Sequence, residues 1–226
     1  MDLGLQGKVA LVVGGTGLVG TAIVAALRAE GATVIAAARG DDADLFMDAR
    51  DASSVDSGIE DVVRDHGHLD VAVISAAPSA RTLDAAHNAD PDAVLQAIDE
   101  KAMVFLRVAN AVLPLMRERG AGRVIGVSGQ NAFMTGNVRG SVRNAALILT
   151  AKNLADAYAG TGVTVNVVSP GTVSAEPRDE VGPGRGGESS PEQIADVVAF
   201  LASPRAAAVS GESIAVGHRL RGVTSM

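Results

Sequence analysis

The 226-residue chain contains no cysteine and no tryptophan, and it has a single tyrosine. Without cysteine, disulfides, thiol nucleophiles and cysteine metal ligands are excluded. The four histidines have no metal-ligand spacing, so we expect no metal site. No apolar run reaches membrane-spanning length and no signal-peptide pattern opens the chain, so we expect a cytoplasmic protein without a membrane partner. The formal net charge of −7 argues against a nucleic-acid partner.

Small apolar residues are abundant. Apolar residues make up 47% of the chain and aromatic residues 2%, so we expect a core of Val, Ala, Leu and Ile in one domain, 1–226. The expected strands are residues 9–13, 32–38, 45–47, 69–75, 122–128, 163–168 and 213–216. The expected helices are residues 18–27, 53–65, 91–119, 138–158 and 191–202. This alternation predicts an α/β fold, a single Rossmann-type doubly wound parallel sheet of about seven strands with helices on both faces.

Local signals set the expected helix boundaries. Ser53 or Ser54 is the expected N-cap of the helix that follows the third strand. Pro91 suits the first position of the helix 91–119, because proline there loses no helical hydrogen bond. Pro114 lies inside that helix, so we expect a kink or an interruption there.

The strand-to-helix junction near the N-terminus predicts a dinucleotide site. Residues 15–20 read Gly-Thr-Gly-Leu-Val-Gly, a G-x-G-x-x-G pattern in its typical structural context. The first glycines permit a tight turn and close approach to a pyrophosphate, and Gly20 lets the helix lie close to the strand. The predicted cofactor-binding residues of this turn are Gly14, Gly15, Thr16, Gly17, Leu18, Val19 and Gly20. The alternative is a structural turn without a ligand.

Several segments follow the carboxyl ends of expected strands, where open parallel sheets bind ligands. We therefore expect them to converge on one cleft. They are residues 14–20, Arg39, Asp48, 75–78, 128–131 and 169–175. Residues 176–190 are rich in Gly, Pro and charge and have no periodicity, so we expect a mobile loop that covers the substrate.

With these segments in order, the chain resembles the short-chain dehydrogenase/reductase family over nearly its full length. Residues 165–171 read Val-Asn-Val-Val-Ser-Pro-Gly, the most specific match after the glycine turn. Residues 48–51 are similar to the family's Asp-Val-Thr-Asp, and 74–77 stand where the family has Asn-Asn-Ala-Gly. The resemblance implies strand order 3-2-1-4-5-6-7 and hydride transfer between NAD(P) and a small carbonyl or alcohol. It also implies a homodimer or homotetramer formed through helix 138–158 and the helix before it.

The catalytic positions depart from the family's pattern. The family's serine, tyrosine, lysine and asparagine fall, in that order, at Ser128, Gly140, Asn144 and Lys101. The usual lysine and asparagine have thus exchanged places. We hypothesise that Lys101 contacts the nicotinamide ribose or polarises a bound water, with Asn144 as its partner. The alternative is a surface lysine and a helix asparagine without a role.

A proton donor is missing from these positions, because reduction of a carbonyl leaves an alkoxide that must be protonated or stabilised. The only tyrosine, Tyr158, lies late in its helix, and the pKa of a serine is too high for a good acid. Four polar residues are candidates for stabilising an oxyanion or orienting a substrate: Arg139, Arg143, Gln130 and Asn131. The alternative is ordinary polarity of a loop and a helix start.

Cofactor choice depends on Arg39, which ends the second expected strand. An arginine there suits the 2′-phosphate of NADP, whereas NAD, the alternative, would favour an acid. The short connection from Arg39 to Asp48 implies that the family's usual helix between strands two and three is absent. The resemblance implies that seven further residues join Asp48 around the cofactor: Ala49, Ser75, Ala76, Ala77, Pro170, Gly171 and, through its backbone, Val173.

Two classes of function remain open. The first is an NADP-dependent reductase or dehydrogenase of a small carbonyl or alcohol with a modified proton relay. The second is a non-catalytic NADP-binding regulator or partner subunit, which the absent tyrosine favours. A weaker third is a lyase or isomerase in the same cleft, because a fold does not decide function.

Overall fold

The computed structural model describes residues 2–78 and 84–223 and contains a seven-stranded parallel sheet. The sheet is built from β1 (Val9–Val13), β2 (Thr33–Ala38), β3 (Leu45–Phe46), β4 (Val71–Ile74), β5 (Gly122–Val127), β6 (Val163–Pro170) and β9 (Ser213–Val216). Its order is β3-β2-β1-β4-β5-β6-β9. The predicted α/β fold and strand order are confirmed, with β9 as the seventh strand.

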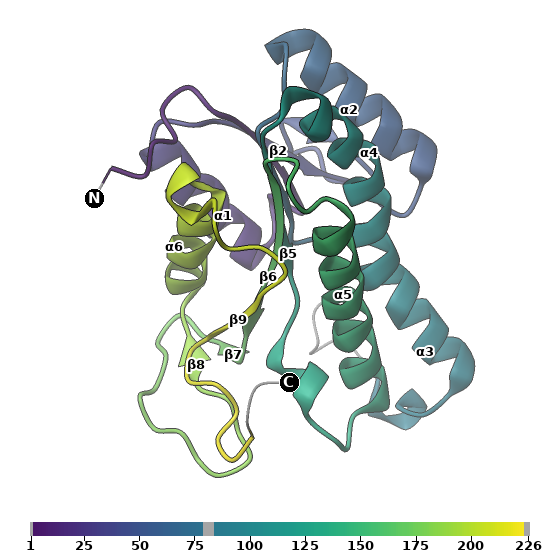
Figure 1. Ribbon diagram of the computed structural model, residues 1–226. Helices are drawn as coiled ribbons and strands as arrows, with labels where there is room; N and C mark the ends of the chain where they lie inside the picture. Colours follow the sequence, from purple (N-terminus) through teal and green to yellow (C-terminus); the bar gives the residue numbers. More distant parts are fainter. Residues whose placement is uncertain (1, 79–83, 224–226) are drawn as a thin grey trace.

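Helices cover both faces of the sheet (Figure 1). They are α1 (Leu18–Ala29), α2 (Ala52–His66), α3 (Pro91–Ile98), α4 (Val104–Arg119), α5 (Val138–Ala157) and α6 (Pro191–Ala202). Figure 1 shows α1 and α6 together on one face and α2, α4 and α5 on the other. Within the described part of the chain, no helix is long and apolar enough to cross a membrane.

The core consists of two apolar clusters that the sheet separates. Along β1, Val9, Leu11 and Val13 belong to the cluster that contains α2, α4 and α5 side chains. Ala10 and Val12 belong to the cluster of α1 and α6. Successive strand residues point to opposite faces, so a strand buried on both sides needs a continuous apolar run. This is why β1 reads Val-Ala-Leu-Val-Val.

The helix preceding β5 differs from its prediction. The predicted helix 91–119 is interrupted by the π-helical turn η3 (Asp99–Met103), which separates α3 from α4. Pro114 lies inside α4, which continues as α-helix to Arg119. The expected interruption at Pro114 is therefore misplaced by more than ten residues along the chain.

The start of α2 also differs from its prediction. Asp51, and not Ser53 or Ser54, is the N-cap, because its carboxylate accepts a hydrogen bond of 2.9 Å from the Ser53 N–H. The helix therefore starts at Ala52. The expectation that no helix separates the second and third strands is confirmed, because β2 runs into β3 through residues 39–44 alone.

The segment 176–190 contains one short strand and is otherwise without regular secondary structure, and its mobility stays a prediction. β8 (Glu188–Ser189) pairs in parallel with β7 (Thr172–Val173) in a second, two-stranded sheet. Arg178 forms an ion pair with Glu188, and the Gly187 N–H donates a 2.7 Å hydrogen bond to the His218 carbonyl. The segment thus packs on the C-terminal residues beside the carboxyl ends of the strands (Figure 1).

Candidate functional site

A cleft of about 530 Å³ lies at the carboxyl ends of the central strands. Nine predicted cofactor-binding residues line it: Gly14, Thr16, Gly17, Arg39, Asp48, Ala49, Ser75, Ala76 and Ala77. Gly15, Leu18, Val19 and Gly20 belong to the same turn and the first residues of α1 but do not line this cleft. Pro170, Gly171 and Val173 follow β6 farther along the sheet.

The glycine turn brings α1 and β4 against β1. Gly14 has a φ of +82°, and a Cβ there would lie 2.6 Å from the Ala76 nitrogen. A Cβ on Gly20 would lie 2.0 Å from the Gly14 carbonyl oxygen. Gly17 is the N-cap of α1 and gives no side-chain cap, so the first N–H groups of the helix have no side-chain acceptor. The turn therefore needs its glycines for backbone contact and leaves donors for an anion.

The other end of the cleft carries two arginines around one carboxylate. Arg50 clamps Asp48 with Nε–Oδ1 and Nη2–Oδ2 distances of 3.0 and 2.8 Å. This pairing lowers the pKa of Asp48 to about 2, with a smaller contribution from the charge of Arg39. Arg39 is exposed and lines the same wall. Arg50 was not among the residues predicted from the sequence. Its position two residues after Asp48 could have indicated that it pairs with that carboxylate.

Lys101 lies on the π-helical turn, a distortion that often marks functional positions. It is 7% exposed, and its Nζ donates a 3.1 Å hydrogen bond to the Ser128 carbonyl. Burial, followed by the positive charge of Arg143, lowers its pKa from 10.5 to about 7. The alternative of a solvent-exposed surface lysine is therefore wrong.

Ser128 joins Lys101 to Asn144. The Ser128 hydroxyl lies 3.1 Å from the Asn144 carbonyl oxygen and 3.3 Å from its Oδ1, and it donates to this residue. The Asn144 amide donates a 2.8 Å hydrogen bond to the Gly140 carbonyl. Lys101, Ser128 and Asn144 are all buried, so the three predicted catalytic residues meet in one place although 16 or more residues separate Ser128 from each partner.

Arg139 and Arg143 lie one turn apart at the start of α5, and both are buried. Arg139 donates to the Asp84 carbonyl at 3.4 Å and Arg143 to the Pro78 carbonyl at 3.2 Å. The Nε atoms of both arginines are buried without a hydrogen-bond partner among the described residues. Burial and the charge of Arg139 lower the pKa of Arg143, which Glu100 partly offsets. The pair thus places two buried positive charges at the start of α5, where Arg143 contacts Pro78 of the cleft.

Gln130 and Tyr158 have structural contacts. The Gln130 amide donates to the carbonyls of Val216 and His218 at 3.4 and 3.2 Å, so it holds the end of β9 and the residues that follow it. Tyr158 ends α5, with the Arg117 guanidinium 5.7 Å from its ring. It lies 18 positions after Gly140, roughly 27 Å along the helix at 1.5 Å per residue. It therefore supplies no hydroxyl to the site.

Comparisons with known proteins agree on one group. A family model described as enoyl-(acyl carrier protein) reductase matches residues 14–218. The chain is similar to 3-oxoacyl-(acyl-carrier-protein) reductase FabG of Salmonella typhimurium, with 28% identity over 95% of this chain and 97% of that protein. It is 33% identical to acetoacetyl-CoA reductase of Shinella zoogloeoides, over 92% of this chain and 95% of the relative.

A solved structure gives the same fold. It is a protein from Burkholderia xenovorans described as a short-chain dehydrogenase/reductase, with a TM-score of 0.81 and 24% sequence identity. The match covers 98% of this chain and 99% of that one. At this identity the likeness establishes the fold alone, whereas the relatives above match nearly their whole length in sequence.

Proposed function

The chain belongs to the short-chain dehydrogenase/reductase family, and from this premise we propose an NADP(H)-dependent oxidoreductase of a small carbonyl or alcohol that works with an altered proton relay. Relatives named as reductases support the reaction class. The observation that carries the proposal is the glycine-lined cleft, whose lining includes Glu100, the chain neighbour of Lys101 in the buried group with Ser128 and Asn144.

The residues of the cleft fit a dinucleotide. No Cβ fits at Gly14 or Gly20, so the backbone lies as close to its neighbours as a phosphate cradle requires, and the first N–H groups of α1 suit the pyrophosphate. Arg39 would hold the 2′-phosphate, while Asp48 and Ala49 would meet the adenine. The small residues Ala76 and Ala77, with Ser75, would flank the ribose, and Pro170, Gly171 and Val173 the nicotinamide. The nicotinamide, when bound, supplies or accepts the hydride.

We assign to Lys101 the role of the general acid that protonates the substrate oxygen. A general acid works best when its pKa lies near the operating pH, and the pKa of Lys101 is about 7. An ammonium has three N–H groups, and Lys101 uses one on Ser128, so the others can reach a water or the substrate oxygen. Glu100, its neighbour on the π-helical turn, lines the cleft. Ser128 and Asn144 then act as positioning residues that hold the ammonium.

The test is binding and turnover in the same preparation. We expect NADPH to bind, as measured by calorimetry, and to be oxidised in the presence of at least one member of a panel of small ketones, ketoacids and acetoacetyl-CoA. Tight binding without turnover on the whole panel would instead favour the non-catalytic regulator. If neither NADPH nor NADH bound, the dinucleotide assignment itself would fail.

Arg39 provides a second, independent prediction. Replacing Arg39 by serine should weaken NADPH binding about 10-fold or more, since a charge-assisted contact to phosphate is lost, and should leave NADH binding nearly unchanged. Arg28→Ser is the matched control, because Arg28 pairs with Asp44 outside this cleft. Equal affinity of the native protein for NADH and NADPH would contradict the assignment of Arg39.

Oligomer formation remains a proposal. Val138, Val142 and Leu149 of α5 are exposed, with Leu149 at 63%. An exposed apolar helix face supports association through α4 and α5 as a homodimer or homotetramer. The cytoplasmic location likewise stays a prediction.

A further inference from the structure

We infer that the substrate of this site is an anion, and that Arg139 and Arg143 bind its carboxylate or phosphate oxygens. The inference rests on the proposed function for the identity of the site as a substrate site. It goes beyond that function by naming the chemical class of the substrate.

The first observation is the unmet hydrogen-bonding capacity of the two arginines. Arg139 is 9% exposed and Arg143 is 3% exposed. A guanidinium has five N–H groups, yet each arginine donates only to one backbone carbonyl in the described part of the chain, and each Nε is buried without an acceptor. Such groups are costly to bury unless an acceptor meets them.

The second observation is charge. Lys101, Arg139 and Arg143 form no ion pair with any residue in 2–78 or 84–223, although buried charges in proteins are normally paired. Glu100 is the acid whose charge reaches Arg143, but its carboxylate accepts a 3.0 Å hydrogen bond from Gln96. Asp84 meets Arg139 through its backbone carbonyl, and its carboxylate lies 3.8 Å from the His87 Nε2. An anion of the substrate would therefore balance the three cations.

The third observation is position. Arg143 donates to the carbonyl of Pro78, which lines the cleft, and its neighbour Asn144 receives the hydroxyl of Ser128. The start of α5 lies at the end of the molecule where the strand carboxyl ends and β8 lie (Figure 1). An oxyanion bound by the guanidinium groups of this arginine pair would place the rest of the substrate beside Ser128 and Lys101. In the proposed function, the cofactor phosphates would have separate partners in the glycine turn and at Arg39.

The test compares matched probes on the whole protein. The probes are 4-oxopentanoate, its uncharged analogue 4-oxopentanamide, and inorganic phosphate, each titrated by calorimetry with and without saturating NADPH. We expect at least one anion to bind in the presence of NADPH and the amide not to bind. A preference for 4-oxopentanoate assigns a carboxylate substrate, and a preference for phosphate assigns a phosphorylated one. Arg139→Gln and Arg143→Gln should each weaken binding about tenfold or more.

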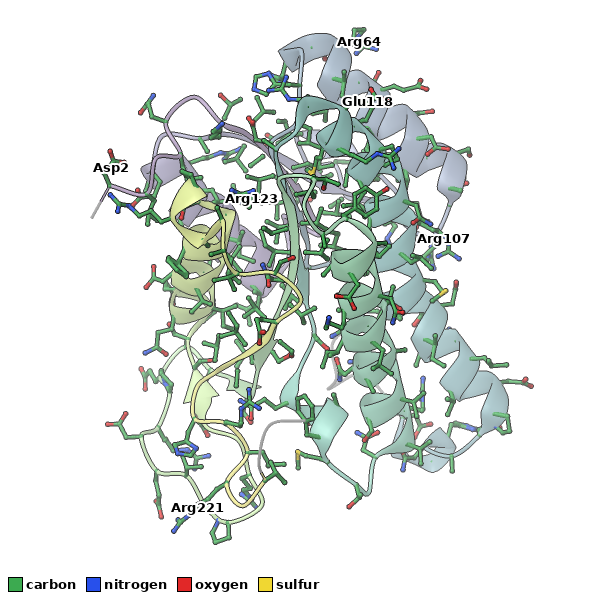
Figure 2. The ribbon with its side chains drawn as sticks, viewed as in Figure 1. Asp2, Arg64, Arg107, Glu118, Arg123 and Arg221 are labelled. Carbon is green, nitrogen blue, oxygen red and sulfur yellow. The ribbon has the colours of Figure 1, made fainter. Side chains whose placement is uncertain are left out.

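Controls separate this inference from its premise. Arg64→Gln should bind the anion normally, since Figure 2 shows Arg64 at the opposite end of the molecule from Arg221 and the C-terminal loops. Without a ligand, Arg143→Gln should melt at a higher temperature than the native protein, because an unpaired buried charge has been removed. Absence of anion binding, unchanged binding in both glutamine variants, or displacement of the anion by NADPH would overturn the inference. Anion binding in a protein that binds no dinucleotide would refute the proposed function alone.

Discussion

Replacing Lys101 by methionine is expected to lower turnover about 10²- to 10⁴-fold while NADPH affinity stays within about threefold. The reason is that Lys101 is the one buried amine at the site with a pKa of about 7, so it can supply the proton for the new hydroxyl at neutral pH. Steady-state kinetics and calorimetric NADPH binding on the same variant measure the two quantities. A loss of NADPH affinity with unchanged turnover per bound cofactor would place Lys101 on the nicotinamide ribose instead.

The pH profile distinguishes a proton donor from a structural lysine. Carbonyl reduction needs the ammonium form, so turnover of the native protein should fall as the pH rises through about 7, and alcohol oxidation should rise there. The Lys101→Met variant should lose this transition. Lys152→Met, which removes an exposed lysine of α5 paired with Asp156, should keep both the rate and the profile.

Replacing Lys101 by methionine should also stabilise the fold. The pKa of Lys101 falls from 10.5 in the unfolded chain to about 7 in the folded one, so between these values the unfolded state binds more protons and stability rises with pH. At pH 7 the buried lysine costs about 4 kcal/mol relative to pH above 10.5. In urea unfolding, Lys101→Met should therefore be more stable at pH 7 and less dependent on pH between 7 and 9. A destabilised variant would contradict the burial of an unpaired ammonium.

Patterns that act over a few residues were readable in the sequence. The α6 and β9 bounds, 191–202 and 213–216, agree with the prediction because a proline and a capping serine begin the helix and an apolar run defines the strand. The glycine turn was equally clear, since its spacing reports the close approach of Gly20 to Gly14. These features depend on local chain geometry, which neighbouring residues determine.

The burial and the lowered pKa of Lys101 could not be predicted from the sequence in this way. It follows Asp99 and Glu100 in a polar stretch typical of a solvated surface, and no sequence signal marks a π-helical turn. Its Nζ donates to the carbonyl of Ser128, 27 residues away, and burial together with the charge of Arg143 lowers its pKa. The exchange of lysine and asparagine drew attention to these two positions, but only the tertiary structure shows that Ser128 links them.

The charge balance of the arginine pair is likewise a property of the whole fold. The sequence offers 26 acidic residues against 19 basic ones, so a deficit of carboxylates around Arg139 and Arg143 could not be foreseen. In the structure most acids lie on helix surfaces and loops, and Glu100, whose charge acts on Arg143, is bonded to Gln96. A negatively charged protein can therefore contain a positively charged site.

A Gly20→Ala variant should lose about 2 kcal/mol of stability and about 100-fold in NADPH affinity. Gly20 is the third residue of α1, and helix propensity alone would make alanine more stable by about 1 kcal/mol. A Cβ there would lie 2.0 Å from the Gly14 oxygen and 3.0 Å from the Gly15 Cα, both backbone atoms, so α1 must move away from the turn. Urea unfolding and calorimetric NADPH binding measure the two losses.

Gly182→Ala is the matched control for Gly20→Ala, because the nearest atom to its new Cβ would be Arg185 Cδ at 3.9 Å and both properties should stay unchanged. The sign of the stability change shows whether the gain in helix propensity or the clash of the new Cβ with the backbone is larger. A more stable Gly20→Ala protein would mean that propensity outweighs the contact and that the turn tolerates a wider gap. Lost stability with intact NADPH affinity would mean that the turn is structural only, and that the first N–H groups of α1 do not hold the phosphates.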